Sequence, residues 1–233
     1  MTLKKWIDSV LCLFFPQTCI VCGGLLAESE QHICVECNMK MPRTHDHLEP
    51  ENVMTRMLWQ HLEINRACAF FLYSKESNYK HILHQLKYHG SKDIGEYFGR
   101  LMATEIVGSH FFEGIDYLIP VPLHPKRYRS RGYNQSECIA NGISSVTGIP
   151  IDISSVIRVV NTHTQTSKNA EQRSENMKDV FTCINHEIFR NKHILIIDDV
   201  FTTGATTISC AQSIQETIPL TVSILTMARA QRG

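Results

Sequence analysis

The fold is decided by residues 194–207, which read Ile194-Leu195-Ile196-Ile197-Asp198-Asp199-Val200-Phe201-Thr202-Thr203-Gly204-Ala205-Thr206-Thr207. An apolar strand leads directly into two adjacent carboxylates, and a short loop of threonines and one glycine follows. We expect a helix over residues 205–216. A strand, a polar loop and a helix in this order are typical of a parallel α/β sheet, in which ligands bind beyond the carboxyl ends of the strands.

The loop after this strand suits a phosphate group. Its backbone N–H groups and threonine hydroxyls precede a helix, whose N-terminus carries a partial positive charge that favours anions. Gly204 has no Cβ, which lets the backbone approach an anion closely. Asp198 and Asp199 would then face ribose hydroxyls or a Mg2+ shared with them. An aspartate pair alone often just ends a strand or caps a helix, but the carboxylates and Thr-Thr-Gly together favour a ribose 5-phosphate ligand.

The remaining chain alternates strands with helices. Apolar runs predict strands at 67–73, 117–123, 193–200 and 221–227, with a further short strand near 151–156. Helical periodicity predicts helices at 79–87, 94–107 and 135–146. This alternation indicates a mostly parallel sheet with helices on its faces.

Charge and hydropathy exclude some functions. Lys plus Arg and Asp plus Glu number 23 each, so no overall field draws the 233-residue chain to nucleic acid or to a membrane. No stretch is long and apolar enough to span a bilayer. The N-terminal apolar residues fall at helical spacing and are interrupted by Asp8 and Pro16, which favours a short amphipathic helix over an export signal. We therefore expect a cytoplasmic protein without a membrane span.

Four of the nine cysteines form two C-x2-C pairs, Cys19 with Cys22 and Cys34 with Cys37. Each pair places two sulfurs on one tight turn, and four thiolates complete the closed tetrahedral shell of a structural zinc site. Two disulfides are the alternative. The other five cysteines are scattered among apolar residues, as buried free thiols of a reducing cytoplasm would be.

A basic segment follows the strand predicted at 117–123. It carries two tyrosines, Tyr128 and Tyr133, and four cations: Lys126, Arg127, Arg129 and Arg131. Such a segment is often only a solvated loop. At the mouth of the sheet it would neutralise a pyrophosphate, or hold a nucleic-acid backbone while its tyrosines stack on bases. The residues leave these uses open.

A second polar segment, 158–181, is too long for an idle connection in a compact domain. It is either a surface excursion or a mobile lid that closes over the ligand and excludes water. The working groups of such a lid would be Arg158, Gln165, Arg173 and Asn176.

Together these segments resemble the ComF family of competence-associated, phosphoribosyltransferase-like proteins. The matches, in order along the chain, are the paired cysteines, Leu86-Lys87-Tyr88-His89-Gly90, Val121-Pro122-Leu123-His124 through Arg131-Gly132-Tyr133-Asn134-Gln135, the polar residues Arg158, Thr162, Gln165, Arg173 and Asn176, and Asp198 to Gly204. Lys168 departs from the family, which often has an apolar residue there.

The resemblance implies an α/β type I phosphoribosyltransferase core with a parallel sheet at 61–233, and an N-terminal helix and zinc-binding module at 1–60. Asp198 and Asp199 would hold the ribose hydroxyls, and Arg173 would join them in catalysis. The pyrophosphate would meet Leu123 and His124, with Lys87 also in the binding site. The 5-phosphate would be bound by Thr202, Thr203, Gly204, Ala205 and Thr206.

Two functions follow from this resemblance. In the first, the protein binds phosphoribosyl pyrophosphate and Mg2+ and serves the uptake of single-stranded DNA in natural transformation, contacting DNA through Lys126, Arg127, Arg129 and Arg131 and meeting DNA-uptake proteins. In the second, it is an active phosphoribosyltransferase of nucleotide metabolism with an unidentified acceptor. No general base for an acceptor is recognisable in the sequence, so the transfer reaction stays open.

Overall fold

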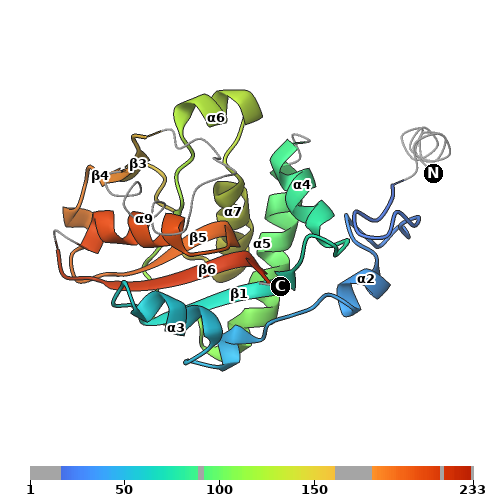
Figure 1. The fold of residues 1–233 in the computed structure, drawn as a ribbon, viewed down its shortest axis with the longest axis horizontal. Helices are drawn as coiled ribbons and strands as arrows, with labels where there is room; N and C mark the ends of the chain where they lie inside the picture. The colour runs from blue at the N-terminus through green and yellow to red at the C-terminus, as the bar shows by residue number, and fades with distance from the viewer. Residues whose placement is uncertain (1–16, 89–91, 161–179, 216–217, 232–233) are drawn as a thin grey trace.

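A four-stranded parallel sheet forms the centre of the molecule (Figure 1). The computed structural model describes residues 17–88, 92–160, 180–215 and 218–231. The strand order is β1-β6-β5-β2, and every pairing within this sheet is parallel. The strands are β1 (Arg66–Tyr73), β2 (Tyr117–Pro120), β5 (His193–Phe201) and β6 (Thr221–Ala230).

Both faces of the sheet are covered, because consecutive apolar residues of β5 point to opposite sides. Leu195 and Ile197 pack in one core with helices α4 (Lys80–Tyr88), α5 (Lys92–Ile106) and α7 (Gln135–Thr147). Ile194 and Ile196 pack in a second core with α3 (Val53–Trp59) and α9 (Ala205–Gln215). Figure 1 shows α5 and α9 on opposite sides of the sheet.

Helices α5 and α7 approach each other at backbone distance. A Cβ on Gly99 would collide with the Ile139 carbonyl, and it would lie 3.0 Å from the Gly142 Cα atom. Glycine on both helices therefore permits this packing, which places the N-terminus of α7 beside the carboxyl end of β5.

Smaller elements surround the sheet. An antiparallel pair, β3 (Val156–Arg158) with β4 (Phe181–Cys183), lies near α9, and α6 (Pro125–Arg131) follows β2. Three single-turn 3-10 helices complete the connections: η1 (Asp46–Leu48), η2 (Val107–Ser109) and η3 (Glu187–Phe189).

The cysteine-containing segment belongs to the first core. Cys19, Ile33 and Cys37 are buried in the same apolar cluster as Phe71 and Phe98, and α2 (Val35–Met39) carries Cys37. Arg43 ties this segment to α5 through two hydrogen bonds to the Glu105 carboxylate, at 2.8 and 2.5 Å.

Most of the predicted elements are present. The strands predicted at 67–73, 193–200 and 221–227 correspond to β1, β5 and β6, and the helices predicted at 79–87, 94–107, 135–146 and 205–216 correspond to α4, α5, α7 and α9. The strand predicted at 117–123 is shorter, because Pro122 and Pro125 follow it and β2 ends at Pro120.

Two predictions were wrong. Residues 151–156 do not form a strand: Ile151 makes only an isolated bridge with Leu118, and β3 begins at Val156. The loop expected after β2 is the helix α6, which has Pro125 in its first turn and ends at Gly132.

The N-terminal helix and most of the lid segment fall in 1–16 and 161–179, outside the described residues. Among the residues that the structure describes, no helix is long and apolar enough to cross a membrane.

Candidate functional site

The polar loop after β5 lines a small pocket that opens to solvent. Asp198 and the five residues predicted to bind a phosphate all lie in its wall, together with Val200, Phe201 and Thr207. The structure therefore brings the carboxylate and the hydroxyl-bearing loop to one place, at the carboxyl end of the central strands, where parallel sheets bind ligands.

The loop turns sharply at Gly204, which has φ of +80°. A Cβ at this position would lie 2.9 Å from two ring carbons of Phe201. Glycine is thus needed for the turn and for packing on Phe201, and the close approach to an anion expected from the sequence stays a prediction. Hydrogen bonds from Thr207 Oγ1 and the Ile208 N–H to the Gly204 carbonyl, at 2.9 and 2.8 Å, begin α9.

Asp198 is held from two sides. Its Oδ1 accepts hydrogen bonds from the Asp199 N–H at 2.9 Å and from Ser136 Oγ, on the first turn of α7, at 3.1 Å. The side chain is buried at the end of β5. Burial first, and then the charge of Asp199, raises the pKa of Asp198 to about 7. A carboxyl group with this pKa is poised to lose its proton when a cation or a hydroxyl-bearing ligand arrives.

Lys87 supplies the countercharge for the second carboxylate. Its Nζ lies 2.9 Å from Asp199 Oδ2, at the end of α4. The charge of Asp199 raises the pKa of Lys87 and outweighs the opposing effect of burial. Lys87, predicted only from its motif, therefore stands in direct contact with the carboxylate pair.

Some cations of the basic segment are exposed to solvent, and others contact neighbouring side chains. Lys126 and Arg129 are exposed on α6, whereas Arg131 donates to Gln135 Oε1 at 2.9 Å and lies over the Tyr88 ring, 5.7 Å from its centroid. The Nδ1 of His124 accepts from the Lys126 N–H at 3.2 Å and caps α6. Tyr133, considered from the sequence as a surface for base stacking, is buried and unavailable for it.

Arg158 interacts electrostatically with Arg127 of the basic segment and with Asp198. Burial lowers the pKa of Arg158, the charge of Arg127 acts in the same direction, and the charge of Asp198 opposes them. Arg158 and Arg127 also help to lower the pKa of His124, after desolvation. Positive charge from Lys87 and Arg158 thus acts on the carboxylate pair. Arg173, Gln165 and Asn176, predicted as lid groups, lie outside the described residues.

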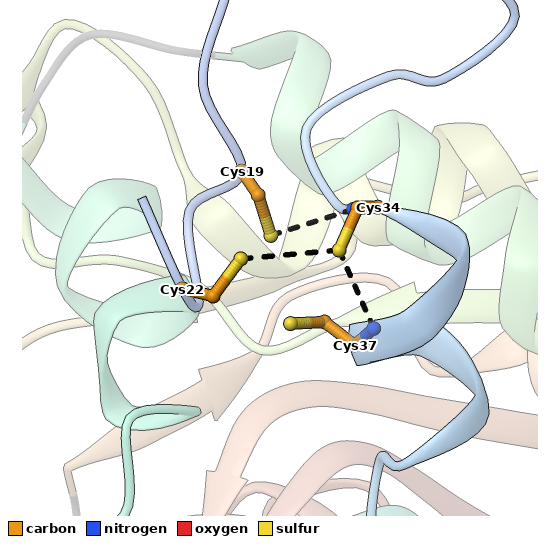
Figure 2. A group of neighbouring side chains, drawn as sticks. All are labelled: Cys19, Cys22, Cys34 and Cys37. Carbon is orange, nitrogen blue, oxygen red and sulfur yellow. Dashed lines mark hydrogen bonds between the residues drawn. The ribbon is translucent and has the colours of Figure 1, made fainter. Parts of the chain in front are cut away.

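The four paired cysteines converge on one point (Figure 2). Their Sγ atoms all lie within 4.8 Å of one another. The Cys22 and Cys34 sulfurs are 3.9 Å apart, too far for a disulfide, and the four residues have free thiols. N–H groups of Gly24, Cys34 and Cys37 each point at a cysteine sulfur over 3.4 Å. Four sulfurs with supporting N–H donors fit a closed, structural zinc site.

Sequence reasoning missed two groups that support the carboxylate site. Ser136 reaches Asp198 across 62 positions, and Tyr133 reaches the Leu86 carbonyl, next to Lys87, across 47. The match to the ComF family from Arg131 to Gln135 and the cap residue Asn134 mark this segment in the sequence, but neither predicts these two contacts.

Sequence comparison finds relatives that cover most of this chain, although no family model matches it. It is 29% identical to the DNA utilization protein YhgH of Escherichia coli O6:H1 over 216 residues, covering 91% of this chain and 89% of that protein. It is 23% identical to the competence protein ComFC of Streptococcus pneumoniae over 209 residues, covering 81% and 89%. Over 90 residues, 38% of this chain and 39% of the relative, it is 37% identical to competence protein F of Haemophilus influenzae.

Two solved structures resemble part of the fold. One is the glutamine phosphoribosylpyrophosphate amidotransferase of B. subtilis complexed with ADP and GMP, at TM-score 0.39 and 18% identity. The other is an allosteric regulatory enzyme of purine biosynthesis, at TM-score 0.40 and 17% identity. Each match covers 59% of this chain, which spans about a quarter of either structure, 26% and 25%.

Proposed function

This chain belongs to the ComF family and has a phosphoribosyltransferase-like α/β core with a four-cysteine cluster, and from this premise we propose that it binds phosphoribosyl pyrophosphate with Mg2+ at the end of β5. The observation that carries the proposal is the pocket in which Asp198 and residues 202–206 share one wall. Few ligands need both carboxylates and a phosphate-binding loop, and a ribose 5-phosphate needs both.

Each part of the ligand has a counterpart. The 5-phosphate would lie against residues 202–206, at the N-terminus of α9, whose partial positive charge favours it. The ribose hydroxyls would donate to Asp198 and Asp199, whose free lone pairs accept them. The pyrophosphate would meet Leu123, His124 and the nearby cations. Mg2+ would neutralise charge on the pyrophosphate oxygens.

Lys87 would change partner when the ligand arrives. Its ammonium group neutralises Asp199, 2.9 Å away. A ribose hydroxyl or Mg2+ at Asp199 would free the ammonium group to face the pyrophosphate, which carries more negative charge. Lys87 would thereby exchange a carboxylate partner for the ligand.

Titration with phosphoribosyl pyrophosphate and Mg2+ by calorimetry tests the proposal. We expect Asp198→Asn combined with Asp199→Asn to weaken binding at least ~100-fold, because two charge-assisted hydrogen bonds are lost. Glu63→Gln is the control, since it removes an exposed carboxylate from the loop before β1, at the opposite end of the sheet. Equal affinity of the double variant and the wild type would refute the assignment.

We propose that the site serves the uptake of single-stranded DNA in natural transformation, and the similarity to a DNA utilization protein and to a competence protein supports a role in DNA handling. The exposed cations of α6, Lys126 and Arg129, with Arg127 beside them, form a surface that would bind phosphates of a strand. Reversing these three charges should weaken binding of an oligothymidine strand and flatten its salt dependence. Unchanged binding would remove α6 from the DNA surface.

An active transferase is the second candidate, favoured by the same pocket. Turnover requires an acceptor that attacks the anomeric carbon while pyrophosphate leaves. Incubation with labelled phosphoribosyl pyrophosphate, Mg2+ and a panel of nucleobases and amines separates the two functions. Release of pyrophosphate that depends on one acceptor identifies an enzyme, and binding without release with every acceptor identifies a binding protein.

A further inference from the structure

The turn between α6 and α7 contacts the two elements that carry Lys87 and Asp198. Residues 131–136 read Arg131-Gly132-Tyr133-Asn134-Gln135-Ser136. Asn134 anchors the turn to the end of β2, because its Nδ2 donates to the Val121 carbonyl at 3.0 Å. The same residue caps α7 by accepting from the Ser136 N–H at 3.1 Å. The turn is therefore fixed to the sheet, and groups that it presents have fixed positions.

Tyr133 holds the end of α4. Its side chain is only 3% exposed, and its hydroxyl donates to the Leu86 carbonyl at 2.6 Å. Leu86 lies in the last turn of α4, where helix carbonyls lack intrahelical partners. The next residue is Lys87, whose ammonium group pairs with Asp199. The tyrosine hydroxyl thus satisfies a helix-terminal carbonyl and fixes the backbone from which Lys87 projects.

Ser136 donates a hydrogen bond to Asp198. It is 4% exposed, and its hydroxyl has one proton, which it gives to Asp198 Oδ1. The Asp199 N–H donates to the same oxygen. With Oδ1 engaged twice, the carboxylate has one orientation, in which Oδ2 is the oxygen offered to a ligand.

We propose that Tyr133 and Ser136 are positioning residues that hold Lys87 and Asp198 in their ligand-binding geometry. The expected consequence, tighter ligand binding, rests on the proposed function. Tyr133 and Ser136 thereby have a task different from nucleic-acid contact, because their hydroxyls point inward at α4 and β5.

Two conservative variants test the inference, each with a matched control from the same segment. Tyr133→Phe and Ser136→Ala remove single hydroxyls. Tyr128→Phe and Ser130→Ala remove the same groups from exposed positions of α6. We expect each of the first pair to weaken binding of phosphoribosyl pyrophosphate with Mg2+ about tenfold, at an unfolding temperature close to that of the wild type, and the controls to bind normally.

A ligand-free readout keeps the inference separate from the proposed function. The lysine ammonium signal of Lys87 in 15N NMR, identified by its loss in Lys87→Met, should move in Tyr133→Phe and stay in Tyr128→Phe. The carboxyl 13C signal of Asp198, identified with Asp198→Asn, should move in Ser136→Ala and stay in Ser130→Ala. All spectra are recorded at one pH.

The outcomes are distinguishable. If the wild type fails to bind phosphoribosyl pyrophosphate while both signals move as expected, the proposed function falls and the positioning roles stand. If both signals stay in place, the positioning roles are overturned whatever the affinity. Ser136→Ala removes a single oxygen atom, so it decides the matter for Asp198 even if Tyr133→Phe proves too unstable to purify.

Discussion

At the residue scale, the raised pKa of Asp198 makes the stability of the folded protein depend on pH. Burial, followed by the neighbouring charge of Asp199, raises its pKa from 3.8 to about 7. Between these values the unfolded chain has released the proton that the folded protein still holds, so the folded state becomes less stable as pH rises. The group is therefore costly to the folded protein at neutral and alkaline pH.

Asp198→Asn should consequently stabilise the protein at high pH. At pH 8 we expect a gain of roughly 2 kcal/mol, or about 5 °C in unfolding temperature, because the amide carries no buried charge. Near pH 3, below both pKa values, the two proteins should unfold alike, since Asp198 is then largely protonated in both states. Thermal melts at the two pH values, with Glu63→Gln as the control, measure the difference. A variant that is less stable than the wild type at pH 8 would contradict the assignment of a buried charge.

Gly204 gives a second residue-scale prediction. Its φ of +80° and the 2.9 Å approach of a Cβ to Phe201 both oppose any side chain. We expect Gly204→Ala to lose about 1–3 kcal/mol of stability and to weaken ligand binding, since the loop must shift. Gly108→Ala is the control, because a Cβ there meets nothing within 4 Å. Equal melting temperatures for the two variants would refute the steric account.

The sequence predicted those residues of the site that are neighbours in the chain. Asp198 and residues 202–206 form one continuous run, so a strand followed by a helix suffices to bring them together. Tyr133 and Ser136 could not be found this way, because their partners are 47 and 62 positions away. Tyr133, which follows Arg131 and Gly132 and precedes Asn134, has the polar neighbours of a surface residue, and only the tertiary contact with Leu86 of α4 shows that it is buried.

At the element scale, long periodic segments were predictable and short ones were not. The central strands and α4, α5, α7 and α9 carry enough apolar residues to show their period. Helix α6 has no buried residue, and its single proline and its cations are typical of a loop. Strands β3 and β4 have three residues each, and their pairing across residues 159–180 leaves no local pattern.

Helix α4 joins the cysteine cluster to the carboxylate pair. Just before the helix begins, the Tyr79 hydroxyl donates to the carbonyl of Cys37 at 2.8 Å. At its other end, Lys87 contacts Asp199. A change in the backbone at Cys37 therefore acts on the element that carries Lys87.

Removal of zinc should accordingly loosen α4. We expect a chelator to increase amide hydrogen exchange in residues 80–88, because the Cys37 carbonyl loses the geometry that Tyr79 requires. Helix α9, which packs in the other core, is the internal control and should exchange at its original rate. Tyr79→Phe should produce part of the same change with zinc bound. Protection of α4 that is equal with and without zinc would show that the two sites are independent.

At the scale of the whole molecule, the cysteine segment and the sheet share one hydrophobic core. Cys19 and Cys37, 2% and 9% exposed, are members of the cluster that contains Phe71 of β1 and Phe98 of α5. The 1–60 and 61–233 division predicted from the resemblance stays a prediction, and the packing gives it a thermodynamic consequence. Segments that share a core unfold together, whereas a module with its own core unfolds separately.

We therefore expect one unfolding transition. If zinc binds the four cysteines, whose Sγ atoms lie within 4.8 Å of one another, its removal should lower the midpoint by about 10 °C or more, because the thiolates lose their common ligand. Scanning calorimetry of the protein with and without a chelator measures this, and readdition of zinc should restore the midpoint. Cys138→Ala, at a buried thiol outside the cluster, is the control and should leave the response to the chelator intact. Two separate transitions, of which only the smaller responds to the chelator, would show instead that the cysteine segment is thermodynamically independent and that α4 carries no coupling between the two sites.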